Sequence, residues 1–327
     1  MRLEYQILAA VALDLALGDP RWLPHPVKGI YRLALALERV ARRLVPSARV
    51  AGILTALTVY GVAGLTAWGT IRLAGLAHPM AADVASIVVI YATIAARDLA
   101  HHSMAVFRPL AAGDLPLARQ RVAMIVGRDT DRLDEPGVAR AAVESVAEST
   151  VDGVTAPLFF ALIAGPVGAM VYRAINTLDS IFGHKDDRYL YFGWASARID
   201  DLANFIPARL TAPLLGAAAL LLGQRPLQSL KILLRDGRKH ESPNAGLAEA
   251  AMAGALGVQL GGLNTYGGEP LDKPTIGDPL VPLAARHIPA ANALMFAASG
   301  LFLAFGLAAR ALTVHIVHIV HLLRSAS

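Results

Sequence analysis

The chain has 327 residues, of which 30 are Lys or Arg and 25 are Asp or Glu, so its formal net charge is +5 at pH 7. Apolar residues make up 55 % of the chain and charged residues 17 %, which excludes an intrinsically disordered protein. The chain contains no cysteine, which excludes disulfides, thiolate nucleophiles and cysteine-bound metal centres.

Long uncharged stretches predict membrane-spanning helices, because about 20 apolar residues cross a hydrocarbon core of ~30 Å. Stretches of this length without a charge lie at 51–71, 153–172 and 290–309. Shorter or interrupted candidates lie at 5–18, 74–96 and 210–224. The basic residues are dispersed among acidic ones, so they indicate loops that flank a membrane and no nucleic-acid interface. We therefore expect a multi-pass integral membrane protein.

The first polar segment, 18–26, contains three prolines, which favour an extended path. His25 in this segment is a candidate acid, base or anion ligand. A lone histidine is more often structural, and the sequence alone does not separate the two interpretations.

Residues 97–152 have the pattern of amphipathic helices, and one helix is expected to begin at 134–136. Near the end of this stretch Glu144, Glu148 and Asp152 follow one another at intervals of four. On a helix they share one face, which drifts by only about 40° per step. No Lys or Arg within the segment offsets them, and carboxylates with substrate phosphates suit Mg²⁺. We favour this interpretation over a solvated acidic face, because an uncharged stretch follows directly.

The uncharged stretch 153–172 is interrupted by Gly165 and Pro166, and Pro157 lies near its start. A broken or re-entrant segment would keep both flanking polar regions on one side of the membrane, which burial in protein permits. We expect such a segment here and no simple crossing.

A second polar cluster follows this stretch. Asp200 and Asn204 are one helical turn apart and can share a ligand, and Pro207 is expected to end their helix. Basic side chains near them suit phosphate or carboxylate. An ion-paired connector fits the composition equally well. The members of the cluster are Asn176, Asp179, Lys185, Arg198, Asp200, Asp201, Asn204 and Arg209.

The C-terminal third begins with an amphipathic pattern at 224–240, typical of a helix on the membrane surface. The turn that contains Asn244 could close a pocket by backbone contacts. Ala and Gly dominate 245–268 and favour close helix packing. The Pro- and Gly-rich segment 265–289 is expected to be a loop.

These patterns predict an all-α, polytopic membrane protein with broken or re-entrant segments and amphipathic loop helices. A single membrane-embedded domain over residues 1–327 is the economical description. The sequence contains no phosphate-binding P-loop, no dinucleotide fingerprint and no nucleophile elbow.

Several motifs closely resemble the CobD/CbiB family of cobalamin-biosynthesis proteins, the adenosylcobinamide-phosphate synthases. They are the runs at 144–152, 172–180 and 196–209, with shorter matches at 14–20, 126–130, 242–246 and 254–262. The resemblance extends from about residue 5 to about residue 310, and the His-rich tail beyond it lies outside the family pattern. Ile181 stands where the family more often has Met.

The resemblance implies an acid–amine ligase of the cell membrane. Such an enzyme joins a propionate carboxylate of adenosylcobyric acid to aminopropanol or its O-phosphate. Activation of a carboxylate by ATP, with Mg²⁺ to screen the phosphates, is the sensible route. Besides the bilayer, further candidate partners are other late cobalamin-biosynthesis enzymes and a second copy of the chain. We assign catalysis to Glu148, Asp200 and Asp201, the metal to Glu144, Glu148, Asp152 and Asp179, and substrate contacts to His25, Arg128, Asn176, Lys185, Arg198, Asn204, Arg209 and Asn244.

Two other classes of membrane protein share some of these features. A transporter of a corrinoid or a related anionic solute would also place charged residues between broken helices. A CDP-alcohol-type phosphotransferase needs Asp-Gly followed closely by Ala-Arg. Here Asp152-Gly153 leads into Val-Thr-Ala-Pro, so that pattern fails.

Overall fold

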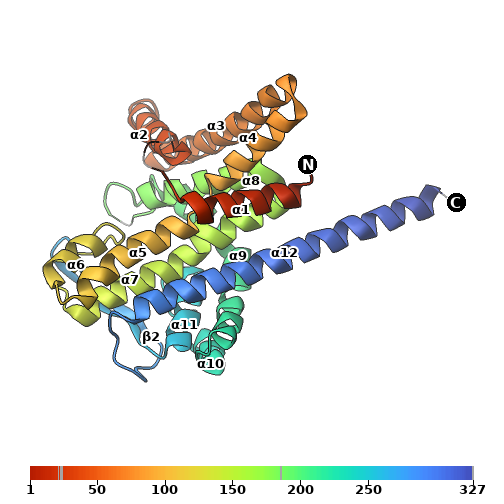
Figure 1. Cartoon of the computed structure of the whole chain (residues 1–327). Coiled ribbons are helices and arrows are strands. Elements are labelled where there is room, and N and C mark those ends of the chain that lie inside the picture. Colours follow the sequence, from red (N-terminus) through yellow and green to blue (C-terminus); the bar gives the residue numbers. More distant parts are fainter. Residues whose placement is uncertain (21, 23–24, 185, 326–327) are drawn as a thin grey trace.

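The computed structural model describes residues 1–20, 22, 25–184 and 186–325. It is helical apart from one two-stranded sheet (Figure 1). The first helices are α1 (Leu3–Leu17), α2 (Pro26–Leu44), α3 (Ala48–Ala77), α4 (Pro79–Tyr91), α5 (Ala96–Ala111) and α6 (Leu115–Val122). The centre consists of α7 (Glu135–Thr150), the π-helical turn η1 (Val151–Thr155), α8 (Ala156–Phe182) and α9 (Trp194–Leu221). The chain ends with α10 (Pro226–Asp236), α11 (Ala245–Leu256), β1 (Leu260–Tyr266), β2 (Glu269–Ile276) and α12 (His287–Ser325).

Five helical stretches of the described chain are long and apolar enough to cross a membrane, which confirms the prediction of a multi-pass membrane protein. Two of the stretches contain breaks, between α4 and α5 and within α8. The C-terminal part of α12 extends well beyond the other helices (Figure 1). The stretches are Ala48–Ala77, Pro79–Ala111, Glu135–Phe182, Trp194–Leu221 and His287–Thr313.

The chain reverses direction inside α8, at Gly165. This residue has φ 66° and ψ −161°, a conformation nearly restricted to glycine, and Pro166 begins the returning arm. The rings of Phe160 and Tyr172 therefore stack at 5.0 Å, although a straight helix would separate them by about 18 Å along its axis. The expected break in this segment is confirmed, and both of its polar flanks lie at one end; its re-entry from one side of the membrane stays a prediction.

The helix α9 corrects one expectation, because it continues through Pro207 and Pro213 to Leu221. A proline inside a helix removes one backbone hydrogen bond but does not always end the helix. Asp200 and Asn204 lie one turn apart on this helix as expected, and the Asn204 amide donates to Asp200 Oδ2 at 2.9 Å.

The small residues of α11 allow a close approach to α10. A Cβ built on Gly254 would lie 2.5 Å from the carbonyl oxygen of Gln228, so only glycine fits there. Eleven of the helix's 12 residues are buried, which confirms the prediction of close packing.

The segment expected as a loop at 265–289 is partly wrong, since β1 and β2 pair antiparallel across it. Gly267 and Gly268 form the two-residue connection with φ 58° and 88°, values that suit a tight hairpin turn. Both amides donate to the Asp129 carboxylate, at 3.1 and 2.8 Å. The hairpin is thereby fastened to the loop before α7.

Candidate active site

Carboxylates from the re-entrant segment and from α9 surround one cavity of about 420 Å³, which we call the carboxylate pocket. Glu148 comes from α7, Asp152 from η1, Asp179 from α8, and Asp200 and Asp201 from α9. They meet because the reversal at Gly165 returns α8 alongside η1. The structure thus brings together all three predicted catalytic residues and three of the four predicted metal ligands.

A chain of hydrogen bonds orients Asp200 in this pocket. The Tyr172 hydroxyl donates to Asn204 Oδ1 at 2.8 Å, which fixes the Asn204 amide so that it donates to Asp200. Asp200 Oδ1 is buried and has no hydrogen-bond partner among the described residues. A buried carboxylate oxygen of this kind is ready to accept a cation or a proton.

Asp152 is presented by the π-helical turn η1, a distortion often found at functional sites. Asn176 Nδ2 donates to Asp152 Oδ2 at 3.2 Å, so this predicted substrate contact acts on the pocket through Asp152. The Gly153 carbonyl accepts from the amide of Ala95 at 2.9 Å, which ties the turn to the start of α5.

The donor set fits a hard cation such as Mg²⁺, since it consists of carboxylates with one unpaired buried oxygen. No three acidic or histidine side chains among the described residues converge closely enough to hold an ion by themselves. Mg²⁺ usually takes one or two carboxylates and completes its shell with water and substrate phosphates. That Asp152, Asp179 and Glu148 contribute ligands to a metal ion therefore stays a prediction.

Basic and amide side chains lie at the rim of the pocket. Arg198 lines it and forms an exposed ion pair with Asp201 at 3.3 Å. Asn244 also lines it and donates to the Asp201 carbonyl at 2.7 Å. Arg209 does not line the pocket, because its guanidinium lies over the Phe205 ring and donates to Asn244 Oδ1 at 3.2 Å. Lys185 lies outside the described residues.

A second, smaller cavity of about 190 Å³ lies beneath the β-hairpin, and we call it the hairpin pocket. Glu148 and His240 line both cavities, so the two adjoin. Among the other lining residues are Arg128, Glu144, Glu249 and Lys273.

Glu144 is not the uncompensated carboxylate that the sequence predicted. Arg128 forms an ion pair with Glu144 Oε2 at 2.5 Å, and the Gly261 amide donates to Glu144 Oε1 at 2.7 Å. Arg128 lies 16 residues away along the chain, so spacing within the acidic segment could not reveal this pair. Glu144 and Arg128 therefore hold the hairpin against α7, and neither lines the carboxylate pocket.

Three lining residues of the hairpin pocket, Glu249, His240 and Lys273, are not among the predicted site residues. Glu249 stands alone in an Ala-rich helix, and burial raises the pKa of its carboxyl well above the ordinary value. Burial lowers the pKa of His240, whose Nε2 lies 4.0 Å from Glu249 Oε1. A charged residue in an otherwise apolar helix was the available signal for Glu249.

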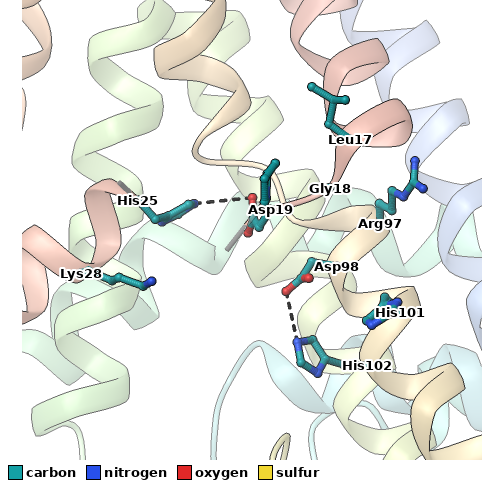
Figure 2. A pocket seen from close by; sticks show the side chains of 10 residues that line it. Leu17, Gly18, Asp19, His25, Lys28, Arg97, Asp98, His101 and His102 are labelled. Atoms are coloured by element: carbon teal, nitrogen blue, oxygen red, sulfur yellow. Dashed lines mark ion pairs between the residues drawn. The ribbon is translucent and has the colours of Figure 1, made fainter. Parts of the chain in front are cut away.

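His25 lies in a third cavity of about 540 Å³, between the end of α1, the start of α2 and the start of α5 (Figure 2). Its Nε2 faces Asp19 Oδ1 at 3.6 Å, and His102 pairs similarly with Asp98 at 3.4 Å. The structure therefore separates His25 from the carboxylate pocket. The α5 side chains in this cavity were not singled out from the sequence.

Comparison with known proteins agrees with this geometry. The family model described as "CobD/Cbib protein" matches residues 7–295, which include every side chain of the carboxylate pocket. The chain belongs to the CobD/CbiB family. Membership places this multi-pass membrane protein in cobalamin biosynthesis.

Curated CobD/CbiB relatives are similar over nearly their whole length. "Cobalamin biosynthesis protein CobD" of Geobacter metallireducens is 54 % identical over 292 residues, covering 89 % of this chain and 92 % of the relative. The protein of the same name from Klebsiella pneumoniae is 45 % identical over 301 residues, covering 91 % and 94 %. "Cobalamin biosynthesis protein CbiB" of Salmonella typhimurium is 45 % identical over 304 residues, covering 92 % and 95 %. No solved structure matches the chain.

Proposed function

We propose that the carboxylate pocket forms the amide bond between a propionate carboxylate of adenosylcobyric acid and aminopropanol or its O-phosphate. The observation that carries the proposal is the convergence of Glu148, Asp152, Asp179 and Asp200 in one cavity, in a chain of the CobD/CbiB family. We further propose that the protein lies in the cell membrane.

The reaction needs an activated acyl group, because a carboxylate is a poor electrophile at neutral pH. In the proposed route a corrinoid carboxylate oxygen attacks the γ-phosphorus of ATP, and the bond from that phosphorus to the ADP oxygen breaks. The amine nitrogen then attacks the acyl carbon, and inorganic phosphate leaves with the bonding electron pair. The amine releases two protons overall, one on losing its positive charge and one on forming the amide.

The pocket supplies groups for these steps. Glu148 is the proposed proton acceptor for the amine, because its exposed side chain lines both adjoining cavities. One or two of the carboxylates of Asp152, Asp179 and Asp200, together with water and the phosphates of ATP, would hold Mg²⁺, which would screen the phosphate charges. Arg198 at the rim would contact an anionic group of a substrate.

The test is product formation by the full-length protein purified in detergent. With adenosylcobyric acid, aminopropanol phosphate, ATP and Mg²⁺, mass spectrometry should detect adenosylcobinamide phosphate and one ADP per product. Omission of ATP should abolish the product. An inactive but folded protein that binds the corrinoid would overturn the proposal.

Transport of a corrinoid or a related anionic solute is the alternative, favoured by the π-helical turn η1, which presents Asp152 to the polar pocket, and by the break in α8 at Gly165. Protein reconstituted in vesicles distinguishes the two functions. Uptake of labelled adenosylcobyric acid without chemical change would support transport, and conversion to the amide without uptake would support synthesis.

A further inference from the structure

The hairpin pocket contains charges that the protein leaves unmatched. Lys273 projects from β2, and its ammonium lies over the Tyr266 ring, 5.5 Å from the centroid. It forms no ion pair with a carboxylate of the described residues. Glu249 also lines the pocket and is only 6 % exposed, and its Oε1 lies 4.0 Å from Nε2 of His240.

The other charged groups of this pocket are already paired. Arg128 and Glu144 bond to each other, and Arg128 also donates to Asn264 at 2.8 Å. His240 Nδ1 accepts from the Ser242 amide at 3.0 Å, so its neutral ring carries a proton on Nε2. One ammonium and two carboxyl groups, those of Glu148 and Glu249, are left to meet a ligand.

A ligand complementary to this set carries both an anionic and a cationic group. A cavity of about 190 Å³ suits a compact molecule with an ammonium group and a phosphate. Burial away from water makes each charge-assisted contact stronger than at a surface.

We propose that the hairpin pocket binds the amine substrate in its phosphorylated form, with the phosphate on Lys273 and the ammonium between Glu249 and Glu148. This proposal rests on the proposed function, since it places the amine beside the acyl group that would be activated in the carboxylate pocket. Glu148 lines both cavities, so it would contact the amine nitrogen and the reaction centre at once. The hairpin, fastened through Asp129, forms the wall of the pocket that carries Lys273.

The experiment is calorimetric titration of the full-length protein in detergent with aminopropanol phosphate, aminopropanol and inorganic phosphate, each alone. Lys273→Met should weaken binding of aminopropanol phosphate by roughly ten- to a hundred-fold, the value of one charge-assisted contact. It should leave binding of aminopropanol unchanged. Glu249→Gln, which keeps the side chain's shape, should weaken both amines and spare inorganic phosphate.

Matched controls are Lys231→Met on the exposed face of α10 and Glu269→Gln at the start of β2, both at exposed positions. Unchanged melting of each variant in detergent establishes folding. The proposal would be overturned if Lys273→Met bound aminopropanol phosphate as tightly as the Lys231→Met control does. It would also be overturned if Arg198→Met lost binding of aminopropanol phosphate and Lys273→Met kept it.

Amide synthesis measured in parallel separates this proposal from the proposed function. Synthesis with an unchanged KM for aminopropanol phosphate in Lys273→Met would refute the pocket assignment and leave the function standing. Lys273-dependent binding without synthesis under any condition would support the pocket and refute the function. A raised KM for the phosphorylated amine with an unchanged KM for ATP supports both.

Discussion

Replacement of Gly165 by alanine tests the re-entrant fold on which the site depends. A Cβ at this position would have Leu3 Cδ2 as its nearest neighbour, at 4.0 Å, which is ordinary van der Waals contact. No steric overlap is therefore expected, and the cost comes from the backbone alone. With φ 66° and ψ −161°, Gly165→Ala should lower the free energy of unfolding by about 1–3 kcal/mol.

The assay is the free energy of unfolding in mixed micelles, followed by far-UV circular dichroism during titration with a denaturing detergent. Gly61→Ala is the matched control, because Gly61 lies within α3 and has no other atom near its Cβ position. The control should be stabilised by about 0.5–1 kcal/mol through reduced backbone entropy. Equal stabilities for the two variants would refute the positive φ at residue 165 and with it the reversal of the chain.

Three further predictions follow from the same structure. Single cysteines at Ser149 and Ser180 should react with an impermeant thiol reagent from the same side of intact cells, because the reversal returns α8 to the end of α7; labelling from opposite sides would contradict it. Arg209→Lys should reduce amide synthesis equally with free and phosphorylated aminopropanol, since Arg209 contacts the pocket through Asn244. A KM raised for the phosphorylated amine alone would contradict this and place the guanidinium on the phosphate. Hydrogen bonds from Arg235 hold the pKa of Asp236 well below its ordinary value, so this carboxylate stabilises the fold above pH ~4, and its contribution is lost as the pH falls further. The melting temperature of Asp236→Asn should therefore lack this dependence on acid pH. A variant whose melting temperature varies with pH as in the wild type would contradict the pairing.

The membrane fold could be predicted because its signals are local. Uncharged stretches of 20 residues mark spanning helices, and the Gly165-Pro166 pair marks the place where one of them reverses. The small hairpin was missed because its glycines and prolines were taken as loop signals. Two consecutive glycines can equally form the tight turn between strands, and Asp129 fixes that turn from a distant part of the chain.

The site was partly predictable for the same reason. Helical spacing groups Glu148 with Asp152 and Asp200 with Asn204, and the reversal of α8 brings the two groups together. Partners that come from distant segments were not predictable, such as Arg128 for Glu144, or Lys273, which lines the same cavity as Glu249. No spacing rule relates residues that meet only through tertiary packing.

Product formation by Glu148→Gln protein is the measurement that most directly tests the central claim, that the carboxylate pocket forms the amide bond. Glutamine keeps the shape of the side chain but cannot accept the proton of the amine, and loss of such a group typically slows a reaction by about 10²–10⁴-fold. We expect a folded variant that forms no adenosylcobinamide phosphate within the wild-type assay time. Normal turnover with unchanged Mg²⁺ dependence would contradict it.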